Sequence, residues 1–267
     1  MRKDINCIAL FTKRNNQESK EISLLLKDKI VEEGIDVIDY LLHENLSHQN
    51  NRVKEIDIGI SIGGDGTTLK TFRTLPPGIP VLSINAGGTR GILSEVSKGS
   101  AISIVPSLLK GDYYLENRVR LSATVGDKTF CPALNDFVFI RSDLTKTPSF
   151  CLSLLGSSIF QKMDGMIIST PTGSTGHSLS NGGPVLLETL ECILVTPIAS
   201  VNRMPSFTIP MVNMDLYANY DIKFIIDGQQ IYEISKNEKI SISRYEHDAV
   251  FLRFNNNMLR QLTKLGY

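Results

Sequence analysis

Apolar and polar positions follow two different patterns in the first hundred residues. Short, almost continuous apolar runs are typical of buried strands; they lie at 5–11, 35–42, 56–62 and 79–86. The stretch 18–34 instead repeats its apolar positions every three or four residues, as an amphipathic helix does, and Gly34 closes it. A second helix is predicted from about Thr67 to Thr74. Strands that alternate with helices predict βαβ units and a parallel sheet, whose ligands gather at the carboxyl ends of the strands.

The pattern of apolar positions changes after about residue 100. One helix at 101–111 is followed by strand-like runs between turn residues, which predict a β-rich second domain. These runs lie at 118–141, 148–155, 164–170, 192–198, 207–212, 216–227, 239–245 and 249–254. The predicted fold class is α/β plus β: a Rossmann-like α/β domain at 1–99, a β-sandwich-like all-β domain at 100–255, and a C-terminal helix at 256–267 that returns to the first domain.

Composition and charge narrow the class of protein. Of the 267 residues, 42% are hydrophobic and 21% charged, which allows a buried core in a soluble chain. A net charge of zero argues against a nucleic-acid partner, and no apolar run suits a membrane span or a signal peptide. The four cysteines form no C-x-x-C pair, which favours reduced thiols in a cytoplasmic protein. The four histidines have no metal-ligand spacing, so we expect no zinc site built by the protein itself.

A glycine loop follows the third predicted strand directly, in the segment SIGGDGTTLK at 61–70. Gly63 and Gly64 allow phosphates to approach the backbone N–H groups, and the N-terminus of the next helix favours the same anions. Asp65 is then a carboxylate in a phosphate-binding turn. The Asp65 carboxylate is suited either to accept a proton from an attacking hydroxyl or to hold a magnesium ion that bridges phosphates. The alternative is a plain turn in which Asp65 caps the helix.

Two further loops have the same polar character. The segment NAGGTRGIL, which begins at Asn85, follows the next strand and would lie beside the glycine loop in a parallel sheet. Asn135 and Asp136 interrupt an otherwise apolar run, so this pair is either a turn or a ligand contact, and both options stay open. We expect the two side chains to leave the core together.

The segment STPTGSTGHSLSNGG at 169–183 is dense in hydroxyls and glycines, which suit a ligand rich in phosphate and ribose oxygens. Within it, GHSLS is one letter short of the G-x-S-x-G elbow that would make Ser178 a nucleophile. Ser180 stands where that elbow needs glycine, and His247 is the one histidine after Ser178, so the sequence argues against a hydrolase. His177 is either a surface histidine or a partner for a nucleotide base, and Lys162 is a solvated lysine by default.

Taken together, these segments resemble the NAD kinase family. The resemblance covers most of the chain and is carried by GGDGT at 63–67, ALNDFVFIR at 133–141, DGMIISTPTGSTGHSLSNGGP at 164–184, IIDGQQ at 225–230 and LTKLGY at 262–267. It implies a small α/β domain followed by a β-sandwich-like domain, in a homodimer or homotetramer. The implied reaction converts ATP and NAD to ADP and NADP, with magnesium.

The resemblance also implies roles for individual residues. Asp65 matches the presumed catalytic base and, with Gly66, a contact to NAD; Lys70 matches a basic position five residues on. Asn135 and Asp136 match the pair that binds ribose and adenine groups of NAD. The other matched positions are the pair Lys162 and Asp164, and an NAD-binding loop that contains Thr172, Thr175, Gly176, His177, Ser178, Leu179 and Ser180. ATP is expected over the glycine loop, which includes Gly63, Gly64 and Thr67.

Two segments depart from the family pattern. Thr175-Gly176-His177 stands where the family usually has T-A-Y, so imidazole replaces an aromatic ring, and NAGGTRGIL replaces T-G-x-L-G-F-L. The predicted function is an NAD kinase that phosphorylates the 2′-hydroxyl of the adenosine ribose of NAD from the γ-phosphoryl group of ATP. The alternatives are a non-catalytic dinucleotide-binding protein and a serine hydrolase that uses Ser178.

Overall fold

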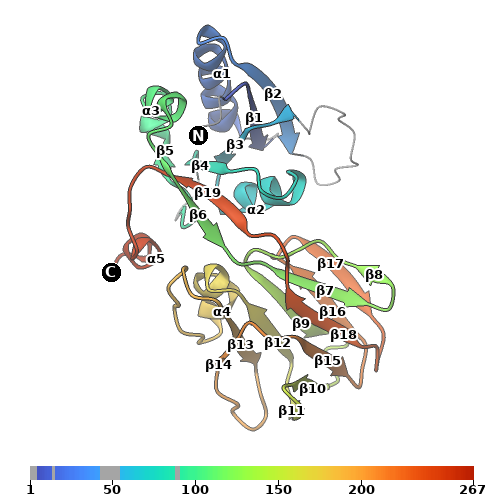
Figure 1. Ribbon diagram of the computed structural model, residues 1–267. Coiled ribbons are helices and arrows are strands. Elements are labelled where there is room, and N and C mark those ends of the chain that lie inside the picture. The colour runs from blue at the N-terminus through green and yellow to red at the C-terminus, as the bar shows by residue number, and fades with distance from the viewer. Residues whose placement is uncertain (1–4, 14–15, 43–54, 88–90) are drawn as a thin grey trace. The chain divides into compact units, whose positions relative to one another are not determined.

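A computed structural model describes residues 5–13, 16–42, 55–87 and 91–267 (Figure 1). The chain forms two compact units. The first combines Met1–Asn117 with Ala249–Tyr267, and the second is 118–248. The candidate site residues are divided between these units.

The first unit is built on a seven-stranded sheet with the order β2-β1-β3-β4-β19-β6, and β5 beside β4. Its strands are β1 (Cys7–Lys13), β2 (Asp36–Leu42), β3 (Ile58–Gly63), β4 (Val81–Asn85), β5 (Val96–Ser97), β6 (Tyr114–Arg118) and β19 (Ala249–Arg253). Its helices are α1 (Gln17–Glu32), α2 (Asp65–Thr74), α3 (Val105–Lys110) and α5 (Arg260–Leu265), with a 3₁₀ turn at Lys98–Ser100. The central pairs β1–β2, β1–β3, β3–β4 and β4–β19 are parallel, which confirms the predicted α/β sheet.

Helix α1 forms where the spacing of apolar residues predicted a helix, and its cap and its buried face explain why. Asn16 caps it by accepting a hydrogen bond from the Ser19 N–H at 2.9 Å. Its buried positions recur at Ile22, Leu26 and Ile30, and they pack into the core of the parallel sheet. Within the described ranges, no helix is long and apolar enough to cross a membrane.

Helix α3 is shorter than predicted. The pattern at 101–111 indicated one helix, but α3 begins at Val105, and turns occupy 101–104. Pro106 lies in the first turn of α3, where its missing N–H costs nothing, and Gly111 ends the helix with φ +70°. Proline inside a longer helix would remove a hydrogen bond, so the helix starts beside it.

The second unit contains two six-stranded sheets, with the orders β11-β10-β15-β18-β7-β8 and β14-β13-β12-β9-β16-β17. The strands of the first of these are β7 (Leu121–Val125), β8 (Lys128–Thr129), β10 (Ser149–Leu154), β11 (Ser157–Lys162), β15 (Met214–Ala218) and β18 (Ile240–Arg244). Those of the second are β9 (Asp136–Arg141), β12 (Gly165–Ser169), β13 (Cys192–Ile198), β14 (Phe207–Pro210), β16 (Ile222–Ile226) and β17 (Gln230–Ile234). A 3₁₀ turn (Thr172–Thr175) and α4 (His177–Ser180) follow β12. Neighbouring strands pair antiparallel in both sheets.

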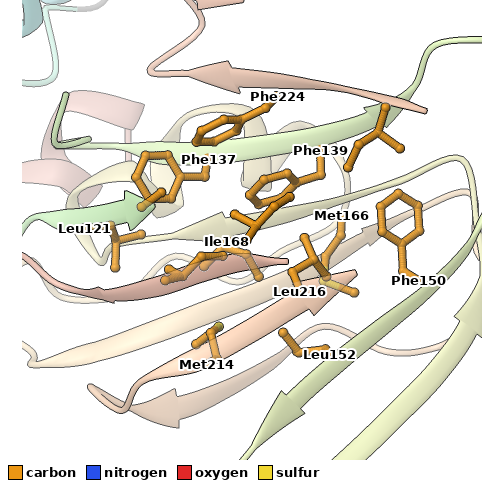
Figure 2. Packing of buried hydrophobic residues seen from close by; sticks show 14 of the residues in the cluster. Leu121, Phe137, Phe139, Phe150, Leu152, Met166, Ile168, Met214, Leu216 and Phe224 are labelled. Atoms are coloured by element: carbon orange, nitrogen blue, oxygen red, sulfur yellow. The ribbon is translucent and has the colours of Figure 1, made fainter. Parts of the chain in front are cut away.

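One hydrophobic core lies between the inner faces of these two sheets (Figure 2). Phe137 and Phe139 of β9 pack on Phe224 of β16, and the Phe139 and Phe224 rings stack with centroids 4.8 Å apart. Leu152 and Leu216 come from the opposite sheet. Each fully buried side chain of this size contributes about 1.5–3 kcal/mol. The packing confirms the predicted β-sandwich and gives a rigid base to the loop after β12.

Two predicted runs are arranged differently from the linear pattern. The stretch 216–227 is split, with β15 in one sheet of the sandwich and β16 in the other. Residues 100–117 and 249–255 lie in the first unit, although the sequence pattern predicted them in the second domain. The reason is that β6 and β19 complete the first sheet, and the apolar pattern of a strand does not specify its pairing partner. Helix α5 also lies in the first unit.

Candidate functional site

The glycine loop joins β3 directly to α2. A Cβ on Gly63 would lie 2.3 Å from Thr67 Oγ1, so glycine is required while the Thr67 side chain folds over it. Gly64 is the N-cap of the ten-residue helix α2 and makes no side-chain cap hydrogen bond. Asp65 is therefore the first helical residue, and the alternative in which Asp65 caps the helix is wrong. The backbone N–H groups of the glycine loop therefore lie at a helix N-terminus, which favours anions.

Both carboxylate oxygens of Asp65 accept backbone hydrogen bonds. The Ile92 N–H donates to Oδ2 at 3.0 Å, and the Leu93 N–H donates to Oδ1 at 2.9 Å. These bonds fix the orientation of the carboxylate and connect the glycine loop with the segment after β4. Each carboxylate oxygen has a further lone pair, so Asp65 can still accept a hydrogen bond from a ligand hydroxyl.

Asn85 lies next to the glycine loop, as the sequence predicted for the second loop. It is the register partner of Gly63 across the β3–β4 pair, and the Ala86 N–H donates to the Gly63 carbonyl at 3.2 Å. A Cβ on Gly91 would lie 2.5 Å from Asn85 Nδ2, so the returning chain packs closely on this amide. Residues 88–90 of the same predicted loop lie outside the described ranges.

Lys70 is half-buried on α2, five residues after Asp65. At 3.6 residues per turn, five positions rotate a side chain by about 140° around a helix. Lys70 and Asp65 therefore occupy different faces of α2, and the spacing alone does not bring the lysine to the carboxylate.

A buried hydroxyl cluster beneath the glycine loop was not recognised in the sequence. Thr68 Oγ1 lies 2.6 Å from Ser83 Oγ and 3.2 Å from Ser61 Oγ, so one hydroxyl of α2 bonds to both β3 and β4. Buried hydroxyls need such partners. The available signal was a serine in the middle of each apolar strand, and the cluster fixes the start of α2 on the sheet.

In the second unit, Asp227 organises the backbone around the Asn135–Asp136 pair. Its carboxylate accepts from the Leu134, Asn135 and Asp136 N–H groups at 3.1, 2.8 and 3.4 Å. Asp227 and Gly228 lie in the β16–β17 turn, and both have positive φ, +49° and +64°. No local pattern in the sequence indicates this role of Asp227, because its partners lie about ninety residues away in the chain.

Asp136 is a buried carboxyl at the start of β9, with 3% of its surface exposed. Burial, and next the negative charge of Asp227, raise the pKa of Asp136 to about 7, while a backbone hydrogen bond from His177 acts in the opposite direction. Near neutral pH this carboxyl is therefore partly protonated and can donate as well as accept a hydrogen bond.

The prediction that Asn135 and Asp136 leave the core together is wrong for Asp136. Asp136 is buried, whereas Asn135 is half-buried. A Cβ on Gly176 would lie 3.7 Å from Asp136 Oδ2 and 3.8 Å from Asn135 Nδ2, so Gly176 lies against both side chains. Among the described residues, Asn135 Oδ1 has no hydrogen-bond partner although the atom is buried. An acceptor of this kind is suited to a donor from a ligand.

The hydroxyl-rich loop after β12 is fastened to the same backbone. Thr170 Oγ1 donates to the Leu134 carbonyl at 2.6 Å, and the Thr170 N–H donates to the Asn135 carbonyl at 2.9 Å. A Cβ on Gly173 would lie 2.1 Å from that same Asn135 carbonyl oxygen, so the loop can approach this closely only with glycine. The predicted NAD loop and the Asn135–Asp136 pair are therefore adjacent.

Some hydroxyls of this loop form hydrogen bonds within it. Ser174 Oγ donates to the Pro171 carbonyl at 2.7 Å and accepts from the Leu186 N–H at 3.0 Å. Thr175 Oγ1 donates to the Thr172 carbonyl at 3.3 Å. Part of the hydroxyl density that the sequence assigned to ligand binding therefore stabilises the loop itself. Outside this internal network, the exposed side chains of the loop are those of His177 and Ser180, and Leu179 is half-exposed.

Ser178 is not placed as a hydrolase nucleophile. It is fully buried, and its Oγ pairs with Thr196 Oγ1 at 2.7 Å. A Cβ on Gly183 would lie 2.1 Å from that Oγ, so the hydroxyl is closely covered. His247 contacts Glu246 at 3.2 Å. The serine-hydrolase alternative has no support in this geometry.

A buried ion pair lies behind Thr172 and was also missed. Arg118 Nη2 lies 3.1 Å from Glu188 Oε1, and the two side chains are 1% and 2% exposed. Arg118 Nη1 lies 3.4 Å from Thr172 Oγ1, so the pair reaches the start of the loop. No motif in the sequence indicates this contact between positions seventy residues apart.

Lys162 and Asp164 lie apart from the other NAD-loop residues. Gly165 pairs with Ile140 and Ser169 with Asp136 across the β9–β12 pair, so Asp164 is at the end of β12 opposite to the loop. The six residue steps from Asp164 to Thr170 span about 20 Å in an extended strand. Asp164 Oδ1 forms an ion pair with Arg141 at 2.9 Å, and Lys162 is exposed at the end of β11.

Comparison with known proteins gives a consistent result for both units. The family model for the ATP-NAD kinase N-terminal domain matches residues 8–113, and that for the ATP-NAD kinase C-terminal domain matches 134–254. An NAD kinase of Methanopyrus kandleri is 34% identical over 218 residues, which cover 78% of this chain and 77% of that protein. An NAD kinase of Pyrococcus abyssi is 29% identical over 275 residues, which cover 95% and 96% of the two chains.

A solved structure agrees at the level of the fold. The crystal structure of an NAD kinase from Archaeoglobus fulgidus in complex with ATP has a TM-score of 0.79, at 24% sequence identity and 98% coverage of both chains. Two sequence signatures correspond to parts of this site. One is the turn that contains Asp65 in the first unit, and the other is the loop that packs closely on Asn135 in the second. On these grounds, the chain belongs to the NAD kinase family.

Proposed function

We propose that this protein is an ATP-dependent NAD kinase, which transfers the γ-phosphoryl group of ATP to the 2′-hydroxyl of the adenosine ribose of NAD. The observation that carries the proposal is the oriented Asp65 carboxylate at the N-terminus of α2, within a glycine loop. A carboxylate in an anion-binding turn has a clear use if a hydroxyl must be deprotonated beside a phosphate. The names of the curated relatives support the same activity.

On the ATP side, the main chain of Gly63–Thr67 would hold phosphate oxygens, since glycine leaves the N–H groups accessible and the helix N-terminus favours anions. Asn85, beside Gly63, is available for a further contact. Within the described ranges, no group of three carboxylate, histidine or cysteine side chains could hold a metal ion. Magnesium would be part of the substrate, bound mainly by the ATP phosphates, where it neutralises charge.

On the NAD side, Asn135 and the loop Thr172–Ser180 are the proposed contacts. The unpartnered Asn135 Oδ1 would accept from an adenine amino group or a ribose hydroxyl. Gly176, next to Asn135 and Asp136, leaves room above both side chains, and the exposed His177 can lie against a nucleotide base. Asp136 would act from beneath, either directly or by fixing the His177 backbone.

The proposed reaction is one in-line transfer. The 2′-hydroxyl oxygen of NAD forms a bond to the γ-phosphorus as the bond from that phosphorus to the β,γ-bridging oxygen breaks, and ADP leaves with the electron pair. Asp65 orients the hydroxyl, accepts its proton as the new bond forms, and returns the proton to solvent. Positioning and charge neutralisation supply most of the rate in such transfers.

Within one copy of the second unit, about 20 Å of strand separates Lys162 and Asp164 from the NAD loop. We propose that they act from another copy in a homodimer or homotetramer. Sedimentation together with the KM for NAD of Asp164→Asn tests this. We also propose a cytoplasmic location, because the four cysteines, all within the described ranges, form no disulfide.

The deciding experiment is an assay of NADP formation from NAD with a panel of phosphoryl donors, including ATP and polyphosphate, with and without magnesium. We expect NADP with magnesium and ATP. If the protein binds NAD but forms no NADP with any donor, it is a dinucleotide-binding protein and the kinase proposal fails. Running NADH in parallel defines the acceptor.

A further inference from the structure

The backbone at Leu93 is held from two sides. Its N–H donates to Asp65 Oδ1 at 2.9 Å, and its carbonyl accepts a hydrogen bond from Arg253 Nη1 at 3.1 Å. The neighbouring Ile92 N–H donates to the other Asp65 oxygen at 3.0 Å. The orientation of the Asp65 carboxylate therefore depends on this short segment, and the segment depends on an arginine that is 160 residues away in the sequence.

Arg253 is itself rigidly held at the end of β19. Its side chain is fully buried, its Nη1 lies 3.4 Å from Glu95 Oε2, and its Nε lies 3.3 Å from Glu116 Oε2. The guanidinium also lies over the Phe251 ring, 4.4 Å from the centroid. Because a guanidinium is planar with donors in a fixed fork, these contacts leave it little freedom to rotate.

Glu95 attaches the C-terminal segment to the same place. Its Oε2 lies 2.6 Å from Arg260 Nη1 at the start of α5, and its Oε1 accepts from the Phe254 and Asn255 N–H groups at 3.0 and 3.3 Å. The Glu95 side chain is 1% exposed. One carboxylate thus connects the chain beyond β19 with the segment that orients Asp65.

Helix α5 brings a further charge to this region. Lys264 lies one turn after Arg260, on the same face of α5, and its charge interacts with the carboxylates of Asp65 and Glu95. Burial, followed by the charge of Arg260, lowers the pKa of Lys264, while the two carboxylates act in the opposite direction. The C-terminal helix therefore lies within electrostatic reach of Asp65.

Stability is a poor explanation for this network. Desolvating buried ions costs several kcal/mol each, and apolar residues of similar size often stabilise a fold as well or better. What a buried, multiply bonded arginine and glutamate provide is fixed geometry.

We infer that Arg253 and Glu95 are positioning residues for phosphoryl transfer, through which the C-terminal segment holds the 92–93 backbone and so orients the Asp65 carboxylate. The inference rests on the proposed role of Asp65. Neither residue is assigned a contact with substrate. A misplacement of about 1 Å at a reacting group can cost roughly a hundredfold in rate, so the network would act on turnover and leave NAD binding to the second unit unchanged.

The first test compares Arg253→Lys and Glu95→Gln with a matched control, Arg120→Lys. Arg120 is also a buried arginine, and it contacts the Pro132 carbonyl at 3.2 Å and the Tyr245 ring at 5.3 Å in the second unit. We expect both network variants to lose about tenfold to a hundredfold in kcat, with the KM for NAD within about twofold of wild type. The control should keep its kcat even where its Tm falls. A wild-type kcat in a folded Arg253→Lys overturns the inference.

The second test asks whether Arg253 acts through Asp65. In an Asp65→Asn background, adding Arg253→Lys should lower kcat by no more than about twofold, because the group that it positions is already disabled. Losses that multiply in full would mean an independent structural effect and overturn the inference. If Asp65→Asn alone keeps wild-type kcat, the proposed role of Asp65 fails, which is a distinguishable result.

If Arg253→Lys does not fold, a third variant, Arg260→Lys, still tests the inference. Arg260 lies at the rim of the network and is 7% exposed, so Arg260→Lys disturbs its outer contacts to Glu95 and to the Asn255 carbonyl but leaves the contacts of Arg253 in place. We expect a severalfold loss of kcat that again disappears in the Asp65→Asn background. An unchanged kcat in this variant and in Glu95→Gln would overturn the inference.

Discussion

Asp65 and Asp136 are both the first residue of a secondary-structure element, and both are contacted by the backbone of a distant segment. Their surroundings are otherwise opposite. Asp65 is half-exposed, with a backbone N–H at each oxygen, whereas Asp136 is buried beside Asp227 and has a pKa of about 7. The comparison teaches that an aspartate in a signature motif does not define its own task. Neighbouring donors make one carboxylate an oriented acceptor, whereas burial beside a second carboxylate keeps the other partly protonated near neutral pH.

The largest effect is expected from replacing Asp65, which tests whether its carboxylate acts as the oriented acceptor. Replacement by asparagine keeps the size of the side chain but removes its basicity, and general-base catalysis is worth roughly 10²–10⁴-fold. We expect kcat of Asp65→Asn to fall by at least that range while the Kd for NAD is retained. Asp215→Asn, at an exposed acid that pairs with Lys239, is the matched control and should keep its kcat. Near-normal turnover in Asp65→Asn would remove this residue from the chemistry.

The second prediction concerns the pH dependence of folding stability that Asp136 creates. Its folded pKa of about 7 lies above its unfolded value of 3.8, so the folded state binds more protons and stability falls as the pH rises between these values. The loss between pH 5 and pH 8 should be about 3 kcal/mol. Urea denaturation at both pH values measures it, and Asp136→Asn should remove most of the difference. An equal pH dependence in the variant would show that Asp136 is ionised in the folded state.

A third prediction separates the two nucleotides. Asp136→Ala removes the acceptor beneath His177 and loosens the NAD loop, which should cost about 1.5–3 kcal/mol, or roughly tenfold to a hundredfold in the KM for NAD. The KM for ATP should barely move, since ATP is assigned to Gly63–Thr67. Steady-state kinetics that vary each substrate in turn provide the measurement. An effect confined to ATP would mean that the two nucleotides have been assigned to the wrong units.

The smallest effect is expected at Ser178. In Ser178→Ala the Thr196 hydroxyl loses its partner, and one neutral hydrogen bond contributes about 0.5–1.5 kcal/mol. We expect a small loss of stability or of NAD affinity, measured by denaturation and by KM. A serine-directed fluorophosphonate probe should leave the wild-type protein unlabelled. Stoichiometric labelling at Ser178 would restore the hydrolase alternative.

The sequence by itself determined the features that depend on neighbouring residues. The apolar period identified β1, α1 and the sandwich strands, and the glycines at Gly63 and Gly64 marked the loop that contains Asp65. The motif at 164–184 was sufficient to indicate the family. Such features are readable because a period of two or 3.6 residues, or a glycine turn, is a property of a few consecutive positions.

Only the tertiary structure decided which segments meet. It joined β19 to the first sheet, brought Asp227 to the backbone of Asn135, and placed Arg253 against Leu93. It also buried Asp136 and set Asp164 apart from the NAD loop. These contacts connect residues far apart in the chain, and the burial and charge environment of a side chain follow from them. No local pattern specifies such pairings, because the same alternating strand can complete either sheet and the same aspartate can face solvent or another carboxylate.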